Sequence, residues 1–335
     1  MIVCFGEMLV RLSAPVGEGL LQSARLAAHM GGAEANVAVS LARLGTGARM
    51  VSVLPDNALG HAARAELRRH GVDVSGLVAG PGRMGLYFLM PAASLRPAQV
   101  LYDRAQSAFA RADFARIDWP AALAGARWLH LSGITPALGE GPAEAALAAA
   151  REAHRQGVAV SFDGNFRAAL WAERRADPAT TLRPFFEAAD LLFVDERDVA
   201  LVLGREVSGE CPAERHLNAA AAAFEMLPRL ARVAATVRVQ HSTDDQELGA
   251  VMATRERRLV ARPRRLSGIV DRIGAGDAFA AGLLHGLVRE GSDAARLDFA
   301  LAACCLKHAI AGDANLAGEA EIAALAAGGG LDVRR

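Results

Sequence analysis

The segment Val270-Asp-Arg-Ile-Gly-Ala-Gly-Asp-Ala-Phe-Ala-Ala-Gly282 carries the strongest local signal in this chain of 335 residues. A strand-like end runs into Gly274, Ala275 and Gly276, and a helix is expected to begin at about Asp277. Glycines at such a junction allow several backbone N–H groups to converge at a helix N-terminus, where they bind phosphate or stabilise a developing negative charge. The segment therefore predicts an anion hole built from these three amides.

Asp277 lies at the same junction, where a carboxylate would repel a bound phosphate. Its presence is explained if it faces a substrate hydroxyl and accepts the hydroxyl proton while the amides hold the group being transferred. Asp is also a common cap at the N-terminus of a helix. The segment alone supports a general base and a helix cap about equally well.

Outward from this segment, strands and helices alternate along most of the chain. Strands are expected at 2–5, 50–54, 128–131, 159–162, 191–194, 233–240 and 248–253, and helices at 35–44, 58–70, 141–156, 176–189, 212–231, 277–290 and 293–311. Such alternation is typical of a parallel sheet sandwiched between helices. Because we find no internal repeat and no long linker, we expect residues 1–335 to form a single α/β domain around a mostly parallel central sheet.

Two strand-like runs, 85–90 and 99–102, interrupt this alternation, and the Pro-containing connection between them is too short for a crossover helix. They are expected to pair antiparallel, apart from the main sheet. Residues 85–90 are apolar on both faces, which suits a lid with one face over a ligand and the other against a second subunit; an ordinary buried strand fits equally well. We predict a small β-sheet lid at about 85–104, with a contribution from residues near 8–16, and a homodimer formed through this lid.

Two further groups of residues suggest ligand binding. Gly31-Gly-Ala-Glu-Ala-Asn36 precedes the first helix, and its paired glycines permit close backbone approach to a small polar ligand, although a glycine turn before a routine helix would look the same. Asn36 itself offers both a donor and an acceptor. Arg104 and Arg167 lie on different elements, and two such arginines can jointly hold a carboxylate or a polyphosphate.

Composition excludes several classes of protein. The chain has 37 Lys and Arg residues and 37 Asp and Glu residues, so its formal net charge is zero. A chain without net positive charge has no bulk attraction to nucleic acid or to an anionic membrane surface. No run of about 18 apolar residues predicts a membrane span, and no secretory leader is visible, so we expect a cytoplasmic protein with reduced thiols. Lys307 is the only lysine, which leaves none for a P-loop or a protein kinase. The histidines lack metal-binding spacings, and no hydrolase elbow occurs.

The segments Gly31-Gly-Ala-Glu-Ala-Asn-Val-Ala38 and Asp271-Arg-Ile-Gly-Ala-Gly-Asp-Ala-Phe279 together resemble the two signatures of the PfkB/ribokinase family of carbohydrate kinases. They occur in the right order, about 240 residues apart, so the resemblance covers essentially the whole chain. It implies a ribokinase-like fold with a β-sheet lid, ATP and Mg²⁺ as cofactors, and room for a monovalent cation. It also implies that Asp277 is the catalytic base and not merely a helix cap.

Within that family the chain is most similar to the 2-keto-3-deoxygluconate kinases. The similar segments are 6–12, 84–87, 102–104, 131–135, 163–171 and 307–313. The resemblance implies a small acidic sugar as substrate, bound by Gly32, Asn36, Tyr87, Tyr102, Arg104, Arg167 and Asp313. Arginines suit a substrate that carries a carboxylate. The implied reaction is phosphorylation of the terminal C6 hydroxyl, with the amides of residues 274–276 stabilising the charge on the transferred group.

Two segments depart from the family pattern. The family's usual Asn-x-x-Glu motif appears here as Asp195-Glu-Arg-Asp198. We expect Asp195, Asp198 and Asn165 on the nucleotide side of the site. There the carboxylates of Asp195 and Asp198 could contact Mg²⁺ through bound water. The expected nucleotide-side glycine loop is replaced by the longer and more acidic segment 240–249. No nucleotide contact can therefore be assigned in that segment.

Three alternative functions compete with this interpretation of the sequence. A family kinase for a neutral ketose, such as fructose or tagatose, would have less need of Tyr102, Arg104 and Arg167. A non-catalytic sugar-binding regulator with the same fold is opposed by the intact Gly-Ala-Gly-Asp sequence and favoured by the altered segment 240–249. A nicotinamide dehydrogenase is disfavoured, because no GxGxxG follows the first strand.

Overall fold

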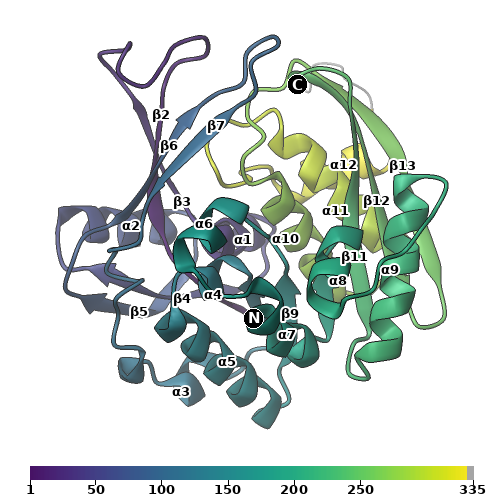
Figure 1. Ribbon diagram of the computed structural model, residues 1–335, viewed down its shortest axis with the longest axis horizontal. Helices are drawn as coiled ribbons and strands as arrows, with labels where there is room; N and C mark the ends of the chain where they lie inside the picture. Colours follow the sequence, from purple (N-terminus) through teal and green to yellow (C-terminus); the bar gives the residue numbers. More distant parts are fainter. Residues whose placement is uncertain (330–335) are drawn as a thin grey trace.

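Nine strands form the main sheet of the computed structural model, which describes residues 1–329 (Figure 1). Their order is β13-β12-β11-β10-β9-β8-β1-β4-β5, with parallel pairing from β5 to β11 and antiparallel pairing from β11 to β13. The strands are β1 (Ile2–Phe5), β4 (Ala48–Pro55), β5 (Asp73–Gly80), β8 (Trp128–Ser132), β9 (Ala159–Asp163), β10 (Leu191–Phe193), β11 (Arg232–Gln240), β12 (Asp245–Thr254) and β13 (Arg258–Ser267). The predicted mostly parallel central sheet is confirmed.

Helices cover both faces of this sheet, and each face has its own apolar core. One face packs against α1 (Ala33–Arg43), α2 (Ala58–Arg69), α10 (Ala275–Leu287) and α11 (Asp293–Lys307). The other packs against α3 (Trp119–Leu123), α5 (Glu140–Arg155), α7 (Pro178–Ala188), α8 (Glu196–Leu203) and α9 (Pro212–Met226). The short helices α4 (Ile134–Ala137) and α6 (Ala168–Arg174) follow β8 and β9, and α12 (Glu319–Ala326) packs on α11.

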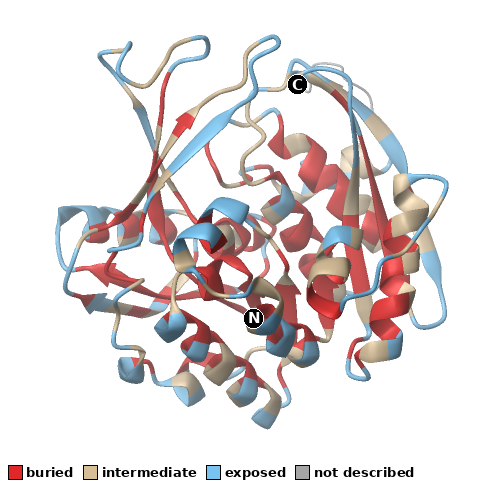
Figure 2. Ribbon diagram, viewed as in Figure 1, coloured by how far each residue is buried: buried red, intermediate tan, exposed pale blue. Residues whose placement is uncertain are grey.

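The burial pattern explains why these segments fold as they do. In α5 the buried alanines 146, 149, 150 and 153 recur at the spacing of one helix face, which lays that face flat on the sheet. Strands β1 and β10 are buried along their whole length, as expected for strands covered by helices on both sides. Figure 2 shows the same division, with buried residues on the central strands and the inner helix faces, and exposed residues on the outer helix faces. No helix among residues 1–329 is long and apolar enough to cross a bilayer.

A second sheet of four strands, in the order β3-β2-β6-β7, rises beside the main sheet (Figure 1). Its strands are β2 (Leu9–Ser13), β3 (Ala27–Gly31), β6 (Gly85–Met90) and β7 (Gln99–Asp103). The predicted antiparallel pairing of 85–90 with 99–102 is confirmed by the β6–β7 ladder. Strand β2 lies within the stretch near residues 8–16 and pairs with β6, whereas β3 was not expected. We refer to these four strands as the lid.

Several element boundaries differ from expectation for physical reasons. The helix expected at 212–231 ends at Met226, because Pro228 disfavours helical backbone at the residue before it. The helix expected at 293–311 ends at Lys307, after which the chain tightens into i→i−3 turns. Strands β5 and β13 were missed. They are the two edges of the sheet, and glycines in β5 and four arginines with Pro263 in β13 hide the strand pattern, as is common at sheet edges.

Segment 240–249 does not form a glycine loop. Strands β11 and β12 stay paired from Arg232 with Thr254 to Gln240 with Gln246, so the two strands form one long hairpin with a tight turn at its tip. Figure 1 shows this hairpin rising to the level of the lid, and at its tip Thr243 Oγ1 donates a hydrogen bond of 2.8 Å to the carbonyl of Ser94, in the connection between β6 and β7. The departure from the family pattern that the sequence showed is therefore an extension of two sheet strands.

Candidate active site

A pocket of about 1310 Å³ lies between the lid and the carboxyl ends of β9, β10 and β11. Ligands of open α/β sheets bind at this end of the strands. Pockets for single small ligands have volumes of roughly 300–1,000 Å³, so this one has room for two. The predicted site residues all line it, namely Gly32, Asn36, Tyr87, Tyr102, Arg104, Asn165, Arg167, Asp195, Asp198, Gly274, Ala275, Gly276, Asp277 and Asp313. The fold thus brings together residues from every part of the chain.

The predicted anion hole is the first turn of α10. Gly274 is the N-cap residue with φ +78°, a left-handed conformation that favours glycine, and a Cβ there would overlap the backbone carbonyl of Asp313. Gly276 has open space around it. The first amides of a helix have no acceptor within the helix. Here the Ala275 amide donates to the Arg272 carbonyl at 3.4 Å, whereas the Gly274 and Gly276 amides have no backbone acceptor among residues 1–329 and are available to a ligand in the pocket. The residues of the predicted anion hole therefore lie at the N-terminus of α10 beside the pocket, and their role in binding an anion stays a prediction.

Asp277 does not cap α10. The helix begins at Ala275 and not at Asp277, and no side chain makes a cap hydrogen bond at its N-terminus. Instead Asn36 Nδ2 donates a hydrogen bond of 2.7 Å to Asp277 Oδ2 from the first turn of α1. Burial raises the pKa of Asp277 to about 7, against the opposing effect of this hydrogen bond. A carboxylate with that pKa is suited to accept a proton near neutral pH.

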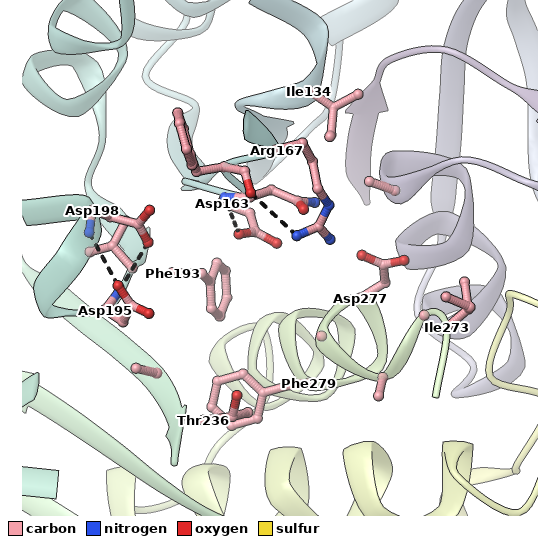
Figure 3. A pocket seen from close by; sticks show the side chains of 18 of the residues that line it. Ile134, Asp163, Arg167, Phe193, Asp195, Asp198, Thr236, Ile273, Asp277 and Phe279 are labelled. Carbon is pink, nitrogen blue, oxygen red and sulfur yellow. Dashed lines mark hydrogen bonds between the residues drawn. The ribbon is translucent and has the colours of Figure 1, made fainter. Parts of the chain in front are cut away.

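Arg167 lies opposite Asp277 across the pocket (Figure 3). It follows β9 through a tight turn in which the Asn165 amide donates to Asp163 Oδ1 at 3.1 Å and Asn165 adopts φ +42°. Burial and the nearby charge of Asp277 raise the pKa of Asp163 to about 8. Burial likewise raises the pKa of Asp198 to about 7. Arg167 therefore carries a positive charge near three carboxyl groups whose pKa values are raised, those of Asp163, Asp198 and Asp277. The sequence did not predict Asp163 as a site residue.

The lid is held onto the anion-hole region by a buried network. Tyr87 OH donates to Asp313 Oδ2 at 2.6 Å. Arg11, which is fully buried on β2, donates from Nη2 to Asp271 Oδ2 at 2.7 Å, and its Nε lies 3.2 Å from Asp313 Oδ1. Asp271 and Asp313 flank the turn that carries Gly274. The role of Arg11 was missed, although one arginine among the apolar residues of Leu9–Ser13 marks an inward charge that needs a partner.

Arg104 is more fully engaged than the sequence suggested. Its Nε donates to Glu7 Oε2 at 2.7 Å, and both side chains are buried. A buried charge requires such a partner, so much of the Arg104 charge is compensated before any ligand binds. Arg104 still lines the pocket beside Tyr102, whose ring it approaches to 5.8 Å.

Asp195 and Asp198 form the N-terminal capping box of α8. Asp195 Oδ1 accepts the amides of Arg197 and Asp198, and Asp198 Oδ2 accepts the Asp195 amide at 3.1 Å. Burial alone would raise the pKa of Asp195, but its hydrogen bonds with Arg197 and these amides outweigh burial and lower it. Both carboxyl groups face the pocket with protein donors already bound. Within residues 1–329 no group of three or more His, Cys, Asp or Glu is arranged to hold a metal ion.

Comparison with known proteins identifies the family. Residues 1–316 match the pfkB family carbohydrate kinase profile. The chain belongs to the pfkB family. This pfkB kinase is 32% identical over 336 residues to a 2-dehydro-3-deoxygalactonokinase of Haloferax volcanii, covering 100% of this chain and 99% of that relative. It is also 30% identical over 316 residues to a fructokinase of Klebsiella pneumoniae, covering 90% of each chain.

Among solved structures, the pfkB kinase resembles a 2-dehydro-3-deoxygluconokinase from Thermotoga maritima. The two are 38% identical, with a TM-score of 0.92 and coverage of 97% of this chain and 98% of that one. The ribokinase-like fold and the family resemblance predicted from the two glycine signatures are confirmed. The protein is a carbohydrate kinase, and the expected enzyme class is likewise confirmed.

Proposed function

We propose that this pfkB kinase transfers the γ-phosphoryl group of ATP to the C6 hydroxyl of 2-keto-3-deoxygluconate, with Asp277 as general base. One observation carries the proposal: the buried Asp277 carboxyl group lies at the N-terminal turn of α10 together with the amides of Gly274 and Gly276, which have no backbone acceptor among residues 1–329, and all of them line one pocket. The C6 hydroxyl gives its proton to Asp277, and its oxygen bonds to the γ-phosphorus. The bond from that phosphorus to the β,γ-bridging oxygen breaks, and ADP leaves. The amides bear the charge on the transferred group.

The acidic substrate is favoured by the charges of the sugar-side half of the pocket. Arg167 has no carboxylate within ion-pair distance among the described residues, so its guanidinium is available to the carboxylate of a sugar acid. Tyr102 and Gly32 lie at the same end, where they could meet the substrate hydroxyls. Two of the relatives reported above bear the name of a kinase for a 2-dehydro-3-deoxy sugar acid, which is the same class of compound. The fructokinase relative is the reason to keep a neutral ketose as the second candidate.

Mg²⁺ would accompany ATP as its phosphate-bound counterion. Asp195 and Asp198 fit an outer position, since the backbone amides they accept in the capping box leave water-mediated contact as the natural arrangement. When bound, the ion neutralises charge on the phosphates.

The outer face of the lid suits the proposed homodimer. Phe88 on β6 pairs laterally with Leu12 on β2 and Leu101 on β7, which puts the three side chains on one face. Leu101 is 58% exposed in the single chain. Sedimentation at micromolar concentration should show a dimer that Leu101→Glu dissociates, and a monomeric wild-type protein would refute this assignment.

The reaction is tested by ADP release with Mg-ATP and a panel of sugars: 2-keto-3-deoxygluconate, its C4 epimer 2-keto-3-deoxygalactonate, fructose, tagatose and ribose. Turnover of keto acids and not of neutral sugars is expected, with Asp277→Asn lowering kcat by about 10²–10⁴-fold. Turnover of a neutral ketose alone would overturn the substrate and leave the kinase. Equal rates for Asp277→Asn and wild type would overturn the base. Failure to phosphorylate any sugar of the panel would favour a sugar-binding regulator.

A further inference from the structure

Two arginines at the nucleotide end of the pocket have no assigned partner. Arg238 is on β11, on the same face as the pocket-lining Thr236, and Arg272 precedes the anion-hole glycine Gly274 by two residues. Neither guanidinium lies within 4.0 Å of a carboxylate among residues 1–329, whereas Arg197 in the same pocket is paired with Asp195. Two uncompensated positive charges therefore lie beside the site of phosphoryl transfer.

The hairpin places one of these charges with some precision. Arg272 Nη2 donates to Gln246 Oε1 at 3.2 Å and lies 3.5 Å from Gln240 Oε1, two neutral side chains from opposite strands of the β11–β12 hairpin. Gln246 is fully buried, so it offers a fixed acceptor. Neutral acceptors orient a guanidinium without cancelling its charge. The extension of the two strands thus provides both Arg238 and the support for Arg272.

The two charges are close enough to affect each other and their surroundings. Burial lowers the pKa of Arg272, and the positive charge of Arg238 lowers it further. Burial, with these two charges also contributing, lowers the pKa of the neighbouring His308 to about 4. The repulsion between two like charges in the free protein is relieved when an anion binds between them. The site consequently favours a ligand of high negative charge.

We infer that Arg238 and Arg272 bind the polyphosphate of the nucleotide, on the side of the anion hole away from the sugar. The sugar-side groups Asn36, Tyr87 and Asp313 lie toward α1 and the lid, so the nucleotide phosphates must reach the anion hole from β11. The chain has no lysine free for this purpose, and arginines supply the charge that a P-loop lysine supplies elsewhere. This inference rests on the proposed use of ATP as the phosphoryl donor, and it assigns a role to segment 240–249.

The test measures nucleotide binding without any sugar. Calorimetry would compare wild type with Arg238→Gln and Arg272→Gln, and with Arg262→Gln, which removes an exposed arginine of β13 outside the pocket. We expect each pocket variant to weaken Mg-ADP binding by about 10- to 100-fold, the usual loss for a charge-assisted hydrogen bond. Adenosine, which carries no phosphate, should bind all four proteins alike, and Arg262→Gln should match wild type for both ligands.

Each outcome decides the inference. Unchanged ADP affinity in both pocket variants overturns it, and so does an equal loss for ADP and adenosine, which would indicate a general disturbance of the site. A wild-type protein that binds no Mg-ADP overturns both this inference and the proposed phosphoryl donor. If the variants lose ADP affinity while the wild type phosphorylates no sugar in the panel, the polyphosphate site stands and the proposed reaction fails. Should a glutamine variant fail to fold, Arg238→Lys and Arg272→Lys keep the charge and should bind ADP within about 10-fold of wild type.

Discussion

Asn36 controls the ionisation of Asp277, and this control can be measured. Its Nδ2 donates to Asp277 Oδ2 at 2.7 Å, a bond that favours the carboxylate form and holds the pKa of this buried group at about 7. Asn36→Leu keeps a side chain of similar size and removes the donor. The carboxylate loses that stabilisation, so the variant should need a higher pH to ionise its base.

The size of the effect follows from the energy of the bond. A hydrogen bond to a charged group contributes roughly 1.5–3 kcal/mol, and 1.36 kcal/mol corresponds to one pH unit. The acid limb of the kcat profile should therefore move up by about one to two pH units. At pH 7 about half of the wild-type base is ionised, but only about 1–10% of it in the variant, which lowers kcat about 5- to 50-fold. Because the base acts when deprotonated, the loss should disappear as the pH rises.

The assay is kcat against pH from about 5.5 to 9.5 with saturating sugar and Mg-ATP, measured as product formed. Ser40→Ala is the matched control: Ser40 Oγ donates to the Asn36 carbonyl one turn along α1, and its loss leaves the Asp277 bond in place. Titration of ATP itself is common to all three proteins and cancels in the comparison. An acid limb that stays in place, or a loss of rate that is the same at every pH, would refute the reasoning and leave Asn36 as a substrate contact only.

Two other predictions follow from the packing around the anion hole. Gly274→Ala should abolish activity and lower stability, because its Cβ would overlap the Asp313 carbonyl and its backbone φ is left-handed. Gly276→Ala, with open space around it, should fold normally. Thermal unfolding and kcat distinguish the two variants, and equal melting temperatures for both would contradict the prediction. Arg11→Met should lower the free energy of unfolding by about 3–5 kcal/mol, since it leaves the buried Asp313 and the partly buried Asp271 without their cation. A urea midpoint within error of wild type would show that these ion pairs are dispensable.

Local features were readable from the sequence because they depend on neighbouring residues. The turn at Gly274 needs a residue without Cβ, and the order of strands and helices follows from the period of the apolar residues. These features were enough to predict the parallel sheet, the β6–β7 pair and an anion hole before α10. The edge strands β5 and β13 were not readable, because an edge exposes polar residues that blur the pattern.

The sequence by itself therefore determined the family, the type of sheet and the residues that gather in the pocket. The tertiary structure decided that the Asp277 carboxyl group accepts a hydrogen bond from Asn36 and does not cap α10, because Asn36 is 241 residues away in the chain. It also decided which arginines are compensated: Arg104 has Glu7, Arg11 has two aspartates, and Arg238 has none among the described residues. The physical reason is that ionisation and charge pairing depend on burial and on distances through space, which neither the type of a residue nor its neighbours in sequence reveal.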